Sequence, residues 1–155
     1  MRESTNFGRQ IGLLARLWRT ELDKRLRPIG LSQARWVLLV YLSEAPDGMP
    51  QLDLAVRAGI SGPTLVRQVD QLEEAGLVAR QEDPRDRRMK RVSLTAAGRA
   101  KFAEADAIAV ALRQDLLSEE DTAALEAAMA VNRRVIRRFE ALNKTVEEGI
   151  ARYAS

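Results

Sequence analysis

The 155-residue sequence contains no cysteine and no histidine. Disulfide bonds, thiol redox sensing and zinc sites built from these residues are therefore excluded. Catalytic arrangements in which histidine activates serine or cysteine are excluded as well. An enzyme would have to use Asp, Glu, Lys, Tyr, Ser or Thr, and no spacing in the chain favours that. We therefore expect a protein without catalytic activity, metal or cofactor.

Long apolar runs are also missing. The longest, Trp36–Leu42, has seven residues, whereas a membrane-spanning helix needs about 20. Residues 1–10 lack the apolar centre of a secretory signal. We expect a cytoplasmic protein that does not associate with membranes.

The chain also lacks a large excess of one charge, since 25 basic residues face 22 acidic ones and the formal net charge is +3. Any basic surface must therefore come from local clustering. Hydrophobic residues make up 46% of the chain. This length and composition are sufficient for the core of one domain.

Apolar periodicity predicts two helices before residue 46. The first has an apolar residue every three or four positions and stops before Pro28 and Gly30; its stripe is Phe7, Ile11, Leu14, Trp18, Leu22 and Leu26. Ser32 is suited to cap the second, largely apolar helix, which ends at the turn residues 46–48.

A helix-turn-helix pattern follows. A short helix over about 51–57 leads through Gly59 to another helix, which begins at Ser61 and carries Pro63 in its first turn. An apolar stripe on this second helix predicts the face that packs on the core: Leu65, Val69 and Leu72. The opposite, outward stripe is polar and consists of Thr64, Arg67, Gln68 and Gln71.

After Gly76 the period falls to two, which predicts two short strands over 77–82 and 89–94. The loop between them, residues 83–88, is too polar for us to expect it in a core. Six basic residues outnumber three acids between Arg80 and Arg91. We therefore predict a protruding basic hairpin, which we call the wing.

These residues suit DNA recognition. Arg, Gln and Thr are side chains that read base edges in the major groove, and Ser61 at the helix start would aim backbone N–H groups at a phosphate. An arginine at the wing tip would enter the minor groove, with Asp86 close enough to pair with Arg88. Phosphate contacts are expected from Arg80, Arg85, Lys90 and Arg91. The alternatives are an ordinary solvated helix face and a solubilising turn.

Two tryptophans, Trp18 and Trp36, share their helices with several arginines. They would suit a pocket for an aromatic acid, with Arg16, Arg19 or Arg35 binding the carboxylate. Packing of both tryptophans in the core is the alternative that sequence alone favours.

The two ends of the chain carry more apolar stripe than the winged module can cover. Thr95 is suited to cap a helix that reaches about residue 116, and residues 118–121 offer the cap of a last helix that continues to the C-terminus. The first and last helices are therefore expected to pair with another subunit.

Several segments together resemble the MarR family of bacterial transcriptional regulators. The most specific block runs from Leu72 to Gly98 and includes the stretches LEEAGLV, DPRDRR and VSLTAAG; RLWR at Arg16, LDKRLRP at Leu22, WVLL at Trp36 and GPTLVRQVDQLEE at Gly62 are similar to its SlyA-like subgroup. The resemblance implies a mainly α fold with a small β-hairpin wing (α+β), a winged helix-turn-helix whose N- and C-terminal helices form a dimerisation region. The expected parts of a single 1–155 domain are dimerisation helices over about 1–30 and 118–155, the winged helix-turn-helix over 32–94 with its recognition helix at 61–74 and wing at 77–94, and a connecting helix over 95–116.

The resemblance also assigns site residues. Pro63, Thr64 and Arg67 fall on recognition-helix contacts, and Arg88 with Asp86 falls on the wing contact, beside Arg85 and Arg87. The subgroup's pocket for aromatic acids falls near Arg16, Arg19, Trp36 and Val40, with Trp18 on the same helices, although the subgroup has histidine where Val40 stands here.

We therefore expect a homodimer that binds double-stranded DNA, most simply a repressor released from a pseudo-palindromic operator by an aromatic carboxylate or an aromatic CoA thioester. One alternative is a global, SlyA-like regulator that opposes nucleoid proteins at A·T-rich sites with little effector control. Another is a winged-helix module that binds protein instead of DNA.

Overall fold

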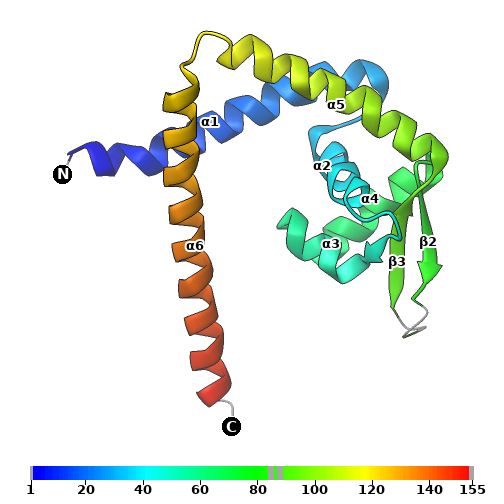
Figure 1. The fold of residues 1–155 in the computed structure, drawn as a ribbon. Helices are drawn as coiled ribbons and strands as arrows, with labels where there is room; N and C mark the ends of the chain where they lie inside the picture. Colours follow the sequence, from blue (N-terminus) through cyan, green and yellow to red (C-terminus); the bar gives the residue numbers. More distant parts are fainter. Residues whose placement is uncertain (1, 84–85, 87–88, 154–155) are drawn as a thin grey trace. The chain divides into compact units, whose positions relative to one another are not determined.

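The computed structural model describes residues 2–83, 86 and 89–153, which divide into two compact units, one up to Arg113 and one from Gln114 (Figure 1). Each unit is considered by itself. The elements in chain order are α1 (Arg2–Leu26), the short 3₁₀ helix η1 (Arg27–Ile29), α2 (Gln33–Ser43), β1 (Met49–Pro50), α3 (Gln51–Ala58), α4 (Gly62–Glu74), β2 (Val78–Glu82), β3 (Lys90–Leu94), α5 (Ala96–Leu117) and α6 (Thr122–Tyr153).

The predicted helix boundaries before residue 46 are confirmed. Gly30 adopts a left-handed conformation with a φ of 78° and ends η1, a geometry that glycine adopts without steric cost. The Ser32 hydroxyl accepts a hydrogen bond from the Arg35 backbone N–H at 3.3 Å and so caps α2. On α2, Leu38, Leu39 and Leu42 are buried.

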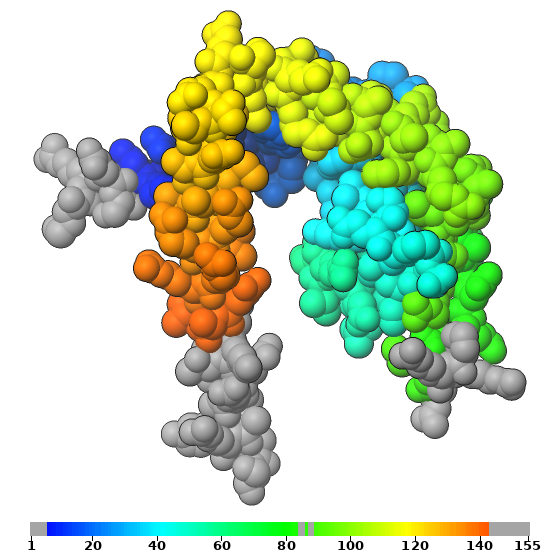
Figure 2. Space-filling view, viewed as in Figure 1, coloured from blue at the N-terminus to red at the C-terminus, as the bar shows by residue number. Residues whose placement is uncertain are grey.

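One continuous core joins the helices to the sheet in the first unit. The predicted apolar stripe of α4 is confirmed, because Leu65, Val69 and Leu72 are all buried. Complete burial of each such side chain is worth about 1.5–3 kcal/mol, so α4 has a strong preference for this orientation. In the space-filling view, α2 and α3 (cyan to teal) and the strands (green) form one packed mass (Figure 2).

The sheet has three strands in the order β1-β3-β2, all antiparallel. In the hairpin, Val78 pairs with Leu94 and Glu82 with Lys90. The prediction of two strands was incomplete, since Met49 pairs with Val92 and adds a third. A strand of two residues is too short to show a period of two, so the sequence pattern carried no signal for it. Helix, turn, helix and wing follow one another in a winged helix-turn-helix.

The start of α5 is fixed to the end of α4. The Thr95 hydroxyl accepts a hydrogen bond from the Gly98 N–H at 2.9 Å and donates one to the Gly76 carbonyl at 2.6 Å. Gly98 is buried, and a Cβ at this position would overlap the carbonyl oxygen of Leu77. The predicted cap at Thr95 is confirmed, and the backbones meet at a distance that only glycine allows.

The first and last helices, α1 and α6, expose apolar side chains. On α1 the exposed ones are Phe7, Ile11, Leu13, Leu14 and Leu17. On α6 they are Met129, Ile136, Phe139 and Leu142, each at least 55% exposed. Asp121 Oδ1 accepts from the Ala123 N–H at 3.4 Å at the start of α6. Within the described residues, no helix is long and apolar enough to cross a membrane.

Candidate nucleic-acid interface and ligand hollow

Ser61 caps the N-terminus of α4. Its hydroxyl accepts from the Thr64 backbone N–H at 3.4 Å and lies 2.9 Å from the Thr64 hydroxyl. Pro63 occupies the first turn, where its lack of an N–H costs no helical hydrogen bond. Both Ser61 and Pro63 are exposed. The partial positive charge of a helix N-terminus is therefore open to an anion here.

The polar stripe of α4 divides into two halves. Arg67 and Gln71 are exposed, as predicted, whereas Thr64 and Gln68 are half-buried. The prediction that all four residues face outward is therefore wrong for Gln68, whose Oε1 is buried without a hydrogen-bond partner. Gln68 follows Leu65 by three positions and precedes Leu72 by four, so it borders the buried stripe. Arg67 lies almost opposite that stripe.

The wing tip lies partly outside the described residues, and this includes Arg85, Arg87 and Arg88. Of the remaining predicted wing residues, Asp86 is exposed and Lys90 is exposed with Glu82 at 3.7 Å. The expectation that the whole loop avoids the core is wrong for Asp83, which is only 5% exposed. A carboxylate is tolerated there because Arg91 Nη1 donates to it at 3.0 Å.

Arg91 anchors the base of the wing. Besides Asp83, it donates to the Gly48 carbonyl at 2.5 Å and to the Asp47 carbonyl at 3.4 Å. Its guanidinium therefore holds β3 against the loop between α2 and β1. The expectation of a phosphate contact did not include this internal role.

Arg80 holds the wing to the helix-turn-helix. Its guanidinium lies 2.6 Å from Asp70 and 2.7 Å from Glu73, both on α4, and donates to the Val66 carbonyl at 3.2 Å. Its Nε donates to Gln51 Oε1 of α3 at 3.2 Å. The Arg80 side chain is 18% exposed, and its internal partners give it a structural role that the expected phosphate contact did not include.

A hollow of about 430 Å³ lies between α1, α2 and α4. Its lining is of mixed polarity and consists of Arg19, Gln33, Ala34, Val37, Ala58, Gly59, Ile60, Thr64 and Gln68. The inward half of the α4 polar stripe thus forms part of its wall. A neighbouring open hollow of about 510 Å³ shares Arg19, Gln33 and Ala34 and adds Thr20, Asp23, Lys24 and Arg27.

Of the predicted effector residues, Arg19 alone lines these two hollows; Arg16, Trp18, Trp36 and Val40 do not. Both tryptophans pack against the core, as the alternative interpretation predicted. The Trp36 Nε1 is buried without a hydrogen-bond partner. The hollow beside Arg19 therefore lies closer to α4 than the predicted effector residues do. Its lining residues Gln33, Val37 and Gln68 were not predicted, because nothing in their spacing indicates a pocket.

Charges along α1 are partly neutralised within the helix. Arg25 Nε donates to Glu21 Oε1 at 3.0 Å, and this hydrogen bond, together with the charge of Lys24, lowers the pKa of Glu21. Arg27 lies 3.6 Å from Asp23. The described residues contain no cluster of three acids that would hold a metal ion.

Comparison with known proteins identifies the relatives of this chain. The sequence profile of the MarR family matches residues 29–89. The transcriptional regulator PA3341, whose crystal structure is known, is 40% identical to this chain in sequence. The match covers 86% of this chain and 98% of the PA3341 chain, with a TM-score of 0.79.

Two further structures show the same fold. CouR from Rhodococcus jostii RHA1, solved bound to p-coumaroyl-CoA, is 27% identical and covers 85% of this chain and 92% of its own, with a TM-score of 0.77. A mutant MarR from E. coli in complex with operator DNA is 22% identical and covers 86% and 95%, with a TM-score of 0.77. With its helix-turn-helix, its three-stranded sheet and these relatives, the chain belongs to the MarR family of transcriptional regulators.

Proposed function

We propose that this protein is a SlyA-like, homodimeric repressor that binds a pseudo-palindromic operator and leaves it when a small anionic effector binds. The observation that carries the DNA-binding part is the orientation of α4. Leu65, Val69 and Leu72 seat the helix in the core, and this leaves Arg67 and Gln71 exposed on the opposite side.

The exposed face of α4 has the chemistry of a recognition helix. Arg67 would donate two hydrogen bonds to a guanine, and Gln71 would bind an adenine edge. Ser61 and Pro63 at the helix start would lie near a phosphate, with Thr64 beside them. Gln68, which faces the hollow, is left out of this base contact.

The wing would bind the flanking minor groove. In this proposal Arg88, oriented by Asp86, enters the groove, and Arg85, Arg87 and Lys90 bind phosphates. The exposed positions of Asp86 and Lys90 support it. Arg80 and Arg91 contribute indirectly, because they hold β2 and β3 in place.

Dimerisation would use the first and last helices, about residues 1–30 and 118–155. The exposed apolar side chains of α1 and α6 support this, because single chains rarely leave such faces in water. Two recognition helices about 34 Å apart would then fit successive major grooves.

An effector in the hollow beside Arg19 would act directly on α4. Thr64 and Gln68 belong to that helix and line the hollow, so a ligand there changes the environment of the recognition helix itself. Arg19 would bind an anionic group, and the unpartnered Gln68 Oε1 would accept a hydrogen bond. An aromatic carboxylate or an aromatic CoA thioester fits this chemistry, and p-coumaroyl-CoA binds the relative CouR. Such a ligand weakens DNA binding only if it prefers the DNA-free conformation.

The first experiment measures binding of the protein to a labelled duplex from the intergenic region beside its gene, against a scrambled duplex, at low and near-physiological salt. Retained preference for its own DNA at the higher salt supports a specific regulator. Equal binding that vanishes with salt would contradict it.

Effector control is tested by calorimetry with aromatic carboxylates and aromatic CoA thioesters, followed by DNA titration with the ligand that binds. We expect loss of DNA affinity in the wild type and weaker ligand binding in Arg19→Gln. Arg9→Gln is the matched control, since Arg9 is on α1 but does not line the hollow. Ligand binding that leaves DNA affinity unchanged would refute effector control.

A further inference from the structure

A third hollow lies at the base of the wing. It encloses about 410 Å³, within the range of small-molecule sites. Three segments form it: the end of α2 with the loop that follows, the end of β3, and the first turns of α5; the lining residues are Leu42, Ser43, Ala45, Pro46, Leu94, Arg99 and Phe102. It shares no residue with the hollows around Arg19.

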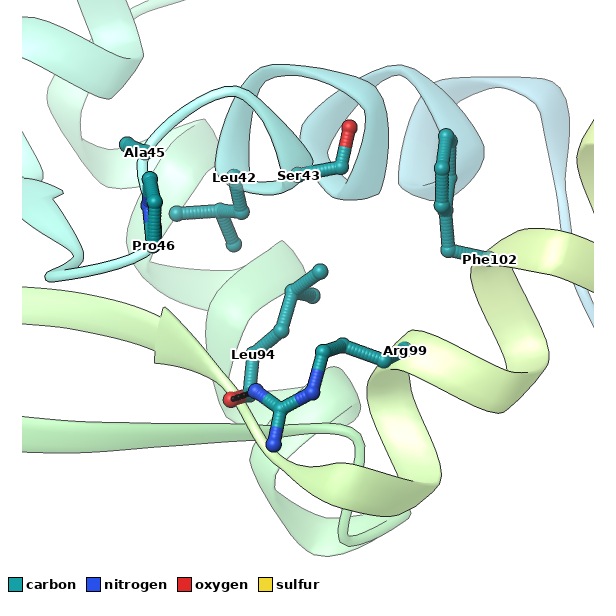
Figure 3. Close-up of a pocket in the computed structure, with 7 residues that line it drawn as sticks. All are labelled: Leu42, Ser43, Ala45, Pro46, Leu94, Arg99 and Phe102. Atoms are coloured by element: carbon teal, nitrogen blue, oxygen red, sulfur yellow. Dashed lines mark hydrogen bonds between the residues drawn. The ribbon is translucent and has the colours of Figure 1, made fainter.

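The walls of this hollow are mostly apolar. Leu42 and Leu94 extend toward each other from opposite sides, and the Phe102 ring stands at one end (Figure 3). Leu42 and Leu94 belong to the buried core, and Phe102 packs against it. These walls rest on rigid elements, so a ligand would meet a site that is already formed.

One cation borders the apolar walls. Arg99 lines the hollow and donates from Nη1 to the Leu94 carbonyl at 3.0 Å. A guanidinium has five N–H donors, so four remain for a ligand, and no described acid forms an ion pair with Arg99. The Ser43 hydroxyl donates to the Val40 carbonyl at 2.7 Å, which leaves its oxygen as an acceptor.

We propose that this hollow is a second small-molecule site, which binds a carboxylate that carries an aliphatic body. The carboxylate would pair with Arg99, because planar guanidinium and carboxylate groups match in geometry and charge. The aliphatic body would lie between Leu42, Leu94 and Phe102, where it loses contact with water. The site is distinct from the effector hollow and does not depend on DNA binding.

The test compares octanoate, octanol and octylammonium as ligands of the full-length protein, by calorimetry and NMR. Octanoate is expected to bind most tightly and to show nuclear Overhauser contacts to the Phe102 ring. Arg99→Glu is expected to weaken octanoate at least about tenfold and to reverse the preference in favour of octylammonium. Arg99→Lys, which keeps the charge, should retain most of the octanoate affinity.

Two controls locate the site and separate it from the proposed effector function. Arg19→Gln should leave octanoate binding unchanged, and thermal unfolding of Arg99→Glu verifies that the variant is folded. The proposal would be overturned by equal affinity for octanoate and octanol. It would also be overturned if Arg19→Gln weakened octanoate binding and Arg99→Glu did not. Neither outcome bears on DNA binding, which is measured without octanoate.

Discussion

At the scale of single residues, Gly98 has the least room for a Cβ among the described glycines, because it lies against Leu77. The Gly98 position has no room for a Cβ, because the atom it would meet is a backbone oxygen that cannot rotate away. Gly98→Ala should therefore lower the free energy of unfolding by about 1–3 kcal/mol, in spite of the better helix propensity of alanine. Chemical denaturation measures this change.

The matched control is Ala97→Val, which adds carbon atoms to an exposed neighbour on the same helix. Its expected cost is below about 0.7 kcal/mol, the range of helix propensities. A Gly98→Ala variant as stable as this control would show that α5 can shift away from Leu77 without penalty.

Arg67 carries a second prediction at this scale. Arg67→Ala should cost about 1–3 kcal/mol in DNA binding and relax base preference at one position in each half-site. Binding to operator duplexes substituted at single positions measures both. The control is Arg57→Ala on α3, whose ion pair with Glu44 at 3.5 Å is exposed and should matter little. Equal losses on specific and random duplexes would contradict base readout by Arg67.

Single residues show where prediction from sequence ended. Helix periodicity identified the buried face of α4, but it could not tell that Gln68, at the border of that face, turns inward. Charge counting likewise placed Arg80 and Arg91 among phosphate contacts. Their acidic partners Asp70 and Asp83 are 10 and 8 positions away in the chain, so only the folded structure brings each pair together.

At the scale of elements, the position of the wing depends on Arg80. This one side chain joins β2 to α4 and α3. Arg80→Gln should remove the ion pairs with Asp70 and Glu73 and destabilise the fold by about 1–3 kcal/mol. Relative to the wild type, amide hydrogen exchange should accelerate in β2 and β3 and change less in α2.

The same variant should lose DNA affinity while remaining folded, because the wing is no longer held beside α4. Lys90→Gln is the control, since it removes a basic wing residue but no contact to α4. It should reduce the slope of log affinity against log salt concentration by about one. Amide hydrogen exchange in β2 and β3 should stay as in the wild type. Unchanged exchange and DNA binding in Arg80→Gln would refute the positioning role.

The order of elements was largely predictable, because most boundaries have a local chemical signal. Ser32, Ser61 and Thr95 are caps, and each caps the helix that the sequence predicted. The strand β1 had no such signal, since two residues form it only by pairing with β3. The ligand hollows were not predictable either, because their walls come from separate elements that meet only in the fold.

At the scale of the whole molecule, the exposed apolar faces of α1 and α6 are the surfaces of the proposed dimer. Phe139 is 61% exposed on α6. In the proposed dimer its burial contributes to association, so Phe139→Glu should convert the dimer to monomer at micromolar concentration. Light scattering after size-exclusion chromatography measures this, and operator affinity should fall with it.

The control is Arg137→Glu, two positions earlier and on another side of α6. It should leave the molecular mass unchanged. A wild-type monomer, or a Phe139→Glu monomer that binds the operator normally, would remove the basis for two recognition helices acting together. A Phe139→Glu variant that stays dimeric would show that Phe139 does not contribute to the interface.

The closure of the wing hairpin below its tip has a consequence for how such a regulator diversifies. The Asp83 N–H donates to the Met89 carbonyl at 2.9 Å, and the Asp83 side chain pairs with Arg91 inside the protein. We therefore expect substitutions and insertions between Asp83 and Met89 to leave β2 and β3 in register. In the proposed DNA complex, sequence changes at the tip would alter operator preference, and the packed fold would stay the same.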